Sequence, residues 1–215
     1  MNETVMSAFE LIGTVAFSIS GALVAISAGL DLFGILFIGT VTAIGGGAMR
    51  DIFLGNTPPA LFSNYTVVVL SLLSALGVFL VAKAKPEHFS EFKEKIERVN
   101  NFFDALGLSA FTVTGSSIAL FSAQSPNLLI VVFSGMITGI GGGMIRDVLV
   151  SKTPFVLRKH IYALASILGS ICYFIIRKST DNDVIPALFS MFLIFSIRVI
   201  ATRYRLELPK INTQK

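Results

Sequence analysis

The chain has few charged residues, one cysteine and two histidines. Of its 215 residues only 14% are charged, whereas 53% are hydrophobic, and the mean hydropathy is +0.78. Ordinary soluble domains carry about 25% charged residues, so the composition indicates an integral membrane protein. The lone Cys172 excludes an internal disulfide and is interpreted as a packing residue. His88 and His160 lack metal-ligand spacing, and no Ser/His/Asp, Cys/His or phosphate-loop pattern occurs, so we expect no catalytic residue, no metal site and no enzyme.

Seven apolar runs are long enough to cross a hydrocarbon layer of ~30 Å, which takes about 20 helical residues. They cover residues 4–26, 33–54, 64–83, 102–123, 127–150, 159–177 and 184–201. The first run has no basic residue before it and is longer than a signal-peptide core, so we expect it to be retained. The predicted fold class is an all-α integral membrane protein with seven transmembrane helices.

Basic residues at the helix ends favour one orientation. If the loops alternate between the two sides, one side carries only Arg177 and Lys178. The other side carries Lys83, Lys85, Lys93, Lys95, Arg98, Lys152, Arg158, Lys159, Arg203, Arg205, Lys210 and Lys215. The positive-inside rule therefore predicts a multi-pass protein of the inner (plasma) membrane with its N-terminus outside and its C-terminus in the cytoplasm. This orientation also accounts for the net charge of +4, so we expect no nucleic-acid binding.

Two halves of the chain repeat each other. "FSISGALVA" (17–25) resembles "FTVTGSSIA" (111–119), and "GTVTAIGGGAMRDIFLGNTP" (39–58) resembles "GMITGIGGGMIRDVLVSKTP" (135–154). Each half contains three helices, and an odd number predicts two inverted repeats followed by an unpaired seventh helix. The expected divisions are a first repeat at 1–83, a cytoplasmic amphipathic connector at 84–101, a second repeat at 102–178, the seventh helix at 179–203 and a tail at 204–215.

Three consecutive glycines occur near the middle of the second and fifth helices. They are Gly45, Gly46 and Gly47 in the first repeat and Gly141, Gly142 and Gly143 in the second. Glycine loosens a helix, and carbonyls freed in this way need protein or water as partners. Broken helices are therefore one interpretation of the triplets, and close helix packing through small residues is the other.

An arginine and an aspartate follow each triplet within one turn: Arg50 with Asp51, and Arg146 with Asp147. A charge near the bilayer centre costs about 2.5–3.5 kcal/mol, so these side chains must face water or partners. Thr42, Gly46 and Arg50 are spaced four residues apart, as are Thr138, Gly142 and Arg146, so each helix presents a polar stripe on one face. Two such stripes that face each other would line a polar path. A structural salt bridge that locks the helices together remains the alternative.

Inversion places the two arginines at different depths. Counting ~1.5 Å per residue, Arg50 lies outward of the glycines and Arg146 inward, at the levels of Glu10 and Asp104 respectively. We therefore expect Glu10 to pair with Arg50 and Asp104 with Arg146. A side chain that moves between pairing and release would act as a gate. Ser18 and Thr112 add hydroxyl groups on the first and fourth helices.

These repeats and the doubled GGG-x-x-R-D motif resemble the prokaryotic branch of the trimeric intracellular cation (TRIC) channel family over nearly the whole chain. The resemblance implies a homotrimer with one pore in each protomer and with the second and fifth helices kinked at the glycine triplets. It further implies potassium-preferring conduction of monovalent cations, with membrane lipid as surroundings and no cofactor; a bound lipid is left open. A glycine transporter is the main alternative, because a broken-helix repeat with an arginine also suits a zwitterion's carboxylate. A structural membrane scaffold is a third possible function.

Overall fold

A computed structural model describes residues 3–63, 65–84, 93–158 and 161–206, and this part of the chain is helical without strands. Seven helices have the length and apolar composition of membrane spans. They are α1 (Glu3–Ser27), α2 (Leu32–Phe53), α3 (Tyr65–Ala84), α5 (Lys93–Ser122), α6 (Leu128–Leu149), α8 (Ile161–Ser179) and α9 (Val184–Arg203). Two short helices, η1 (Ala60–Phe62) and α7 (Phe155–Arg158), follow α2 and α6. The predicted all-α class with seven spans is confirmed.

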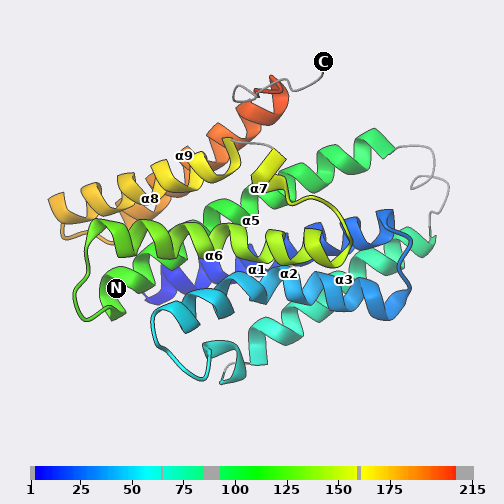
Figure 1. Cartoon of the computed structure of the whole chain (residues 1–215), viewed down its shortest axis with the longest axis horizontal. Coiled ribbons are helices and arrows are strands. Elements are labelled where there is room, and N and C mark those ends of the chain that lie inside the picture. Colours follow the sequence, from blue (N-terminus) through cyan, green and yellow to red (C-terminus); the bar gives the residue numbers. More distant parts are fainter. Residues whose placement is uncertain (1–2, 64, 85–92, 159–160, 207–215) are drawn as a thin grey trace, which may run out of the picture.

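Four helices form the centre of the bundle. α5 packs against α6 and α1, and α2 packs against α1 and α6. α3 covers α1 and α2 on one flank, whereas α8 and α9 cover α5 and α6 on the other (Figure 1). The first repeat thus consists of α1, α2 and α3, the second of α5, α6 and α8, and α9 is the unpaired helix.

Contacts between α1 and α5 demonstrate the inversion of the two repeats. The rings of Phe17 and Phe111 lie 5.3 Å apart between their centroids. Gly13 leaves space for the ring of Phe111, and Gly107 leaves space for the ring of Phe17. Because the residue numbers rise along one helix as they fall along the other, the equivalent helices run antiparallel, as the inverted-repeat prediction requires.

Matching caps begin the second helix of each repeat. The side chain of Asp31 accepts a hydrogen bond from the Gly34 N–H at 2.8 Å, and that of Asn127 accepts one from the Ile130 N–H at 3.0 Å. Each cap satisfies a backbone donor at a helix N-terminus. The polar residue before each apolar run therefore sets where α2 and α6 begin.

Large apolar side chains cover the outside of the bundle. Phe192 on α9 is 71% exposed, and Leu73 and Leu80 on α3 are 60% and 55% exposed. Such a surface would drive aggregation in water, but it matches the hydrocarbon of a bilayer. The chain is a multi-pass membrane protein.

The expected connector at 84–101 differs from the observed helix. Residues 85–92 lie outside the described part. From Lys93 onward the chain already belongs to α5, because no glycine or proline occurs between Lys93 and Asp104 to end the helix. Asn100 and Asn101 are buried in the bundle, so the second half of the expected surface connector is part of the fourth span.

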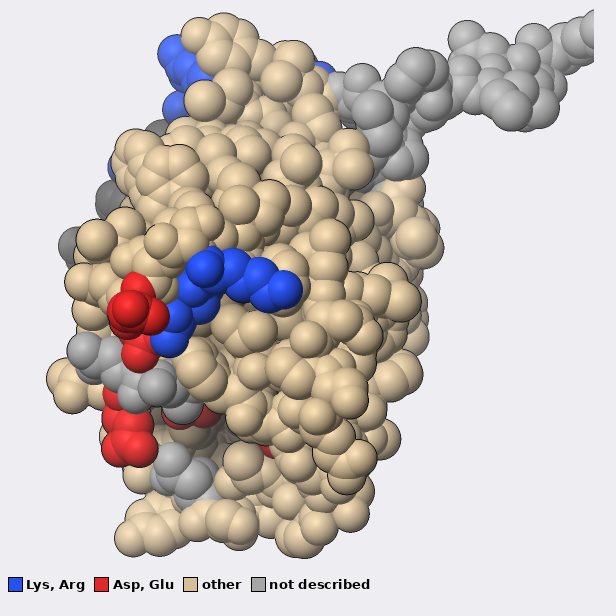
Figure 2. All heavy atoms as spheres, turned by 90° about the vertical axis from the view of Figure 1, so that its left-hand side faces the viewer, with Lys and Arg blue, Asp and Glu red and all other residues tan. Residues whose placement is uncertain are grey.

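Basic residues are sparse at the end of the bundle where α1 begins. Figure 2 views this end and shows a band of basic side chains beside acidic ones across a mostly uncharged face, with further basic atoms only at its upper edge. Arg177 and Lys178 belong to the last turn of α8, at this end. Lys83 and Arg203 belong to the last turns of α3 and α9, at the opposite end.

Candidate functional site

The two glycine triplets lie where α2 and α6 cross. A Cβ atom on Gly46 would overlap the carbonyl oxygen of Thr138, and a Cβ atom on Gly142 would overlap that of Thr42. A Cβ atom on Gly141 would lie 3.2 Å from the Cα of Gly46. The two backbones therefore touch directly, and a larger residue would push the helices apart.

The other glycines of the triplets have different neighbours. The first of each triplet faces a flexible side chain of the other helix, and the third faces the arginine of its own motif. These pairs are Gly45 with Ile145, Gly141 with Met49, Gly47 with Arg50, and Gly143 with Arg146.

Both helices continue through their glycines without interruption. α2 is helical from Leu32 to Phe53 and α6 from Leu128 to Leu149. The expectation of helices broken at the triplets is wrong for this structure, because the absent side chains serve the crossing and not an unwound backbone. The packing interpretation, which the sequence left open, is the one observed.

Thr42 and Thr138 face the crossing with their carbonyl groups and not with their hydroxyl groups. Each hydroxyl donates at 2.6 Å to the carbonyl oxygen four residues earlier in its own helix, at Ile38 and Ser134 respectively. Such bonds are common for threonine in membrane helices. At these positions α2 and α6 meet in close backbone contact.

Arg146 lies at the centre of what we call the α6 charge cluster, formed by Asp104, Arg146, Asp147 and Arg198. Its Nη1 lies 3.0 Å from Asp104 Oδ1, and its Nε lies 2.8 Å from Asp147 Oδ1. The same Nη1 donates to Ser20 Oγ at 2.8 Å. Arg146 is fully buried and ties α6 to α5 and α1, and the predicted pairing of Asp104 with Arg146 is confirmed.

Arg50 has a simpler environment at the equivalent position of the first repeat. Its Nη2 and Nε donate to Asp51 Oδ1 at 2.7 and 2.9 Å. Arg50 forms no ion pair with Glu10, so the expected contact between these two described residues is wrong. The guanidinium turns instead to the neighbouring carboxylate, which is held from its other side.

Both aspartates of the Arg-Asp motifs hold the chain that follows their helix. Asp51 Oδ2 accepts the N–H of Ala60 at 2.9 Å, and Asp147 Oδ2 accepts the N–H of Phe155 at 2.9 Å. Each carboxylate therefore balances its arginine with one oxygen and docks a short helix with the other. This arrangement supports a structural role for the motif, one of the two roles that the sequence left open.

Ser18 and Thr112 connect the central helices to the flanking ones. Ser18 Oγ donates to the carbonyl oxygen of Ser71 on α3 at 2.6 Å. Thr112 Oγ1 lies 2.9 Å from Ser166 Oγ on α8. Both hydroxyl groups are used at equivalent interfaces within the repeats, away from the α2–α6 crossing.

Arg198 and Asn100 were not predicted as site residues. Arg198 Nη2 lies 3.9 Å from Asp104 Oδ2, and Asn100 Oδ1 accepts a hydrogen bond from Ser20 at 2.8 Å. A signal for Arg198 was present, since a basic residue inside the apolar run 184–201 is unusual. Asn100 gave no signal, because it lies in a segment that the sequence assigned to the surface connector.

The arrangement combines a narrow helix crossing with buried charges at two depths. Among the described residues, no three His, Cys, Asp or Glu side chains are grouped so that they could hold a metal ion. Arginines and carboxylates in a low-dielectric interior create fixed fields that attract or repel ions. The site is therefore suited to controlling the passage of charged or zwitterionic solutes.

Comparison with known sequences identifies relatives over most of the chain. The profile of the family described as "Glycine transporter" matches residues 7–83 and 101–178. The UPF0126 inner membrane protein YadS of Escherichia coli K12 is 34% identical over 204 residues, which are 93% of each chain. A UPF0126 membrane protein of Deinococcus radiodurans is 38% identical over 181 residues, covering 79% of this chain and 80% of that protein.

Three solved structures that are similar to this chain are TRIC channels. A chain described under "Structural basis for conductance through TRIC cation channels" has 33% identity and a TM-score of 0.83, covering 97% of this chain and 98% of its own. A prokaryotic TRIC channel crystallised in 0.5 M KCl has 33% identity and a TM-score of 0.85, and the match covers 95% of this chain and 99% of that channel. The TRIC trimeric intracellular cation channel orthologue from Rhodobacter sphaeroides has 29% identity and a TM-score of 0.83, and the match covers 95% of this chain and 100% of that orthologue.

Proposed function

The chain belongs to the prokaryotic TRIC channel family, and we propose that it is a potassium-preferring channel for monovalent cations. The observation that carries the proposal is the 33% identity with a TRIC cation channel over 97% of this chain, at a TM-score of 0.83. The likeness extends over the bundle as a whole and is not limited to one helix pair.

The proposed assembly is a homotrimer in which each protomer has its own ion pathway. One of the similar structures is described as a trimeric channel. Within one chain, α2 and α6 already face each other across the inverted repeat. A single protomer can therefore provide both walls of a pathway, as in other inverted-repeat transport proteins.

The crossing of α2 and α6 is the constriction of this proposed pathway. At Gly46 and Gly142 the helix backbones touch, which leaves no room for an ion between them. Conduction therefore requires the crossing to widen, and Arg50 and Arg146 lie one turn from it on its two sides. Movements of these buried charges would couple the crossing to the membrane potential.

The proposed orientation places the N-terminus outside the cell and the C-terminus in the cytoplasm. It rests on the basic residues at the end of the bundle where α3 and α9 finish. In this orientation Arg50 lies in the outer half of the pathway and Arg146 in the inner half.

A glycine transporter is the second candidate, favoured by the description of the matching family profile. Arg50 or Arg146 could bind the carboxylate of an amino acid. A carrier of this kind would alternate between two closed states and would not form a continuous pathway.

The decisive experiment is electrical recording from purified protein in planar bilayers, with protein-free bilayers as the control. We expect unitary current steps and a reversal potential that follows the potassium gradient, with smaller currents when sodium replaces potassium. Saturable glycine uptake into vesicles without current steps would contradict the channel and support the carrier. Light scattering on the purified protein measures its mass, and a monomeric mass would contradict the proposed homotrimer.

A further inference from the structure

Arg198 is the only described basic side chain of α9 that is buried in the bundle, at 2% exposure. Its Nη2 lies 3.9 Å from Asp104 Oδ2, which is within ion-pair range but beyond a hydrogen bond. Its guanidinium lies over the ring of Tyr162, 4.4 Å from the ring centroid, and its buried Nε has no partner within the described residues. Arg198 is therefore held by charge and ring stacking and not by a full set of hydrogen bonds.

Asp104 lies between two arginines. One carboxylate oxygen pairs with Arg146 at 3.0 Å and the other faces Arg198 at 3.9 Å. Asp104 is 1% exposed, so little water screens either interaction. The charge of Arg198 therefore acts directly on the carboxylate that holds Arg146.

The repeats provide an internal comparison for this arrangement. Glu10, Arg50 and Asp51 correspond to Asp104, Arg146 and Asp147, and when all are counted as ionised each set carries one excess negative charge. α9 has no counterpart in the first repeat, and its Arg198 cancels the excess in the second set only. The unpaired helix thus makes the two halves of the pathway electrically unequal.

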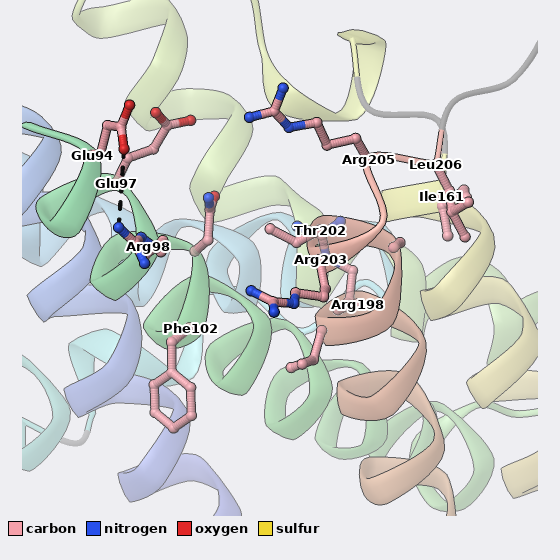
Figure 3. Close-up of a pocket in the computed structure, with 13 residues that line it drawn as sticks. Glu94, Glu97, Arg98, Phe102, Ile161, Arg198, Thr202, Arg203, Arg205 and Leu206 are labelled. Atoms are coloured by element: carbon pink, nitrogen blue, oxygen red, sulfur yellow. Dashed lines mark ion pairs between the residues drawn. The ribbon is translucent and has the colours of Figure 1, made fainter.

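A cavity of about 680 Å³ lies against Arg198 between the start of α5 and the end of α9. Figure 3 shows this cavity, with Arg198, Arg203 and Arg205 on one side of it and Glu94, Glu97 and Arg98 on the other. Arg198 thus borders this cavity although its side chain is only 3% exposed, and Arg146 is not among the residues that line it. Of the two arginines that face Asp104, Arg198 is the one that borders this cavity.

We propose that Arg198 is a positioning residue of the pathway: by sharing Asp104 with Arg146, it neutralises the inner half and makes conduction unequal in the two directions. This inference rests on the proposed channel function. Removing the charge would restore the excess negative charge of the inner half, which attracts cations and lowers their barrier there.

The test compares unitary currents at equal positive and negative voltages in symmetrical KCl, with channels inserted in one known direction. We expect the parent protein to pass unequal currents at the two voltages. In Arg198→Gln the ratio of the larger to the smaller current should fall toward one, by a factor of about two or more. Arg198→Lys keeps the charge and should retain the parent ratio. Arg203→Gln is the matched control, because it removes an exposed charge from the last turn of the same helix, where solvent screens it.

A purely structural role gives a different result. Arg198→Gln and Arg198→Lys would then both reduce the yield of folded protein and leave the current ratio unchanged, and this outcome overturns the inference. An equal change of the ratio in both variants overturns it as well, since charge would then not be the cause.

A second measurement separates this inference from the proposed function. In detergent, the melting temperatures of Arg198→Gln, Asp104→Asn and the double variant form a thermodynamic cycle. We expect the double variant to lose ~3 °C less than the sum of the single losses, because each single change leaves an unbalanced buried charge. Coupling without any potassium current would mean that the channel proposal fails while the pairing stands. Current without coupling would mean that only the role of Arg198 fails.

Discussion

Gly46 lies directly against the carbonyl oxygen of Thr138, and the inverted repeat places Gly142 in the same way against Thr42. These two contacts fix the separation of α2 and α6. The middle glycine of each triplet is therefore explained by the close approach of two backbones.

Replacing Gly46 or Gly142 with alanine should destabilise the protein. The added Cβ meets a backbone carbonyl that cannot move without its helix, so we expect a loss of about 1–3 kcal/mol, as for other overpacked positions. Thermal unfolding in detergent measures this loss. Gly77→Ala on α3 is the control, since nothing lies within 4 Å of the added atom, and it should be neutral or slightly stabilising. Equal melting temperatures for Gly46→Ala and Gly77→Ala would contradict the tight crossing.

Arg146 should contribute more to stability than Arg50, its repeat equivalent. Arg146→Leu removes two ion pairs: Asp104 keeps only Arg198 at 3.9 Å, and Asp147 keeps only its bond to Phe155. Breaking a buried pair of this kind costs about 3–5 kcal/mol. Arg50→Leu removes one ion pair, with Asp51, which likewise keeps its bond to Ala60. Comparing the two melting temperatures tests this order, and an equal or larger loss for Arg50→Leu would show that the α6 charge cluster is not the main lock.

Asp147 should protect the segment after α6 from proteolysis. Its Oδ2 fixes the Phe155 N–H, so Asp147→Ala should release the chain around Lys152. Local opening controls cleavage by proteases, and we expect trypsin to cut after Lys152 several-fold faster in this variant. Asp31→Ala is the control, because it removes a helix cap at the start of α2 and should leave cleavage at Lys152 unchanged. Unaltered cleavage in Asp147→Ala would refute the docking role.

The sequence predicted the elements of the fold because each rests on a local rule. Apolar run lengths located the spans, and a regular rise per residue placed Asp104 at the depth of Arg146. The same count placed Glu10 at the depth of Arg50, yet these side chains do not pair. Depth along a helix does not determine the direction of a long side chain, and Arg50 turns to its neighbour Asp51.

Other features depend on which helices meet. The triplets could break a helix or pack it, and only the crossing with α6 decides this for Gly46. Arg198 became part of the site because α9 packs on α5. Such tertiary choices are set by the sum of many contacts and leave no periodic signal in one segment.

The orientation of the chain is open to direct labelling. In a Cys172→Ser background, Asn2→Cys should react with an impermeant maleimide added outside intact cells, and Asn212→Cys should react only after the membrane is opened. The expectation follows from seven spans and from the basic residues at one end of the bundle. Labelling of both cysteines from the same side would exclude an odd number of spans.

The two ends of the proposed pathway should differ in how their charges act together. Glu10→Gln should reduce potassium current and Arg50→Gln should raise it, because the first removes a negative charge and the second a positive one. These two side chains form no ion pair, so their effects on the logarithm of the current should depart less from additivity than those of the pair in the second repeat. Asp104 and Arg146 are in contact at 3.0 Å, and Asp104→Asn combined with Arg146→Gln should depart clearly from the sum of the single effects. Single-channel recordings of the six variants in bilayers provide both cycles. Strong coupling between Glu10 and Arg50 would show that the open channel brings them together, and additive effects at Asp104 and Arg146 would show that their ion pair has no part in conduction.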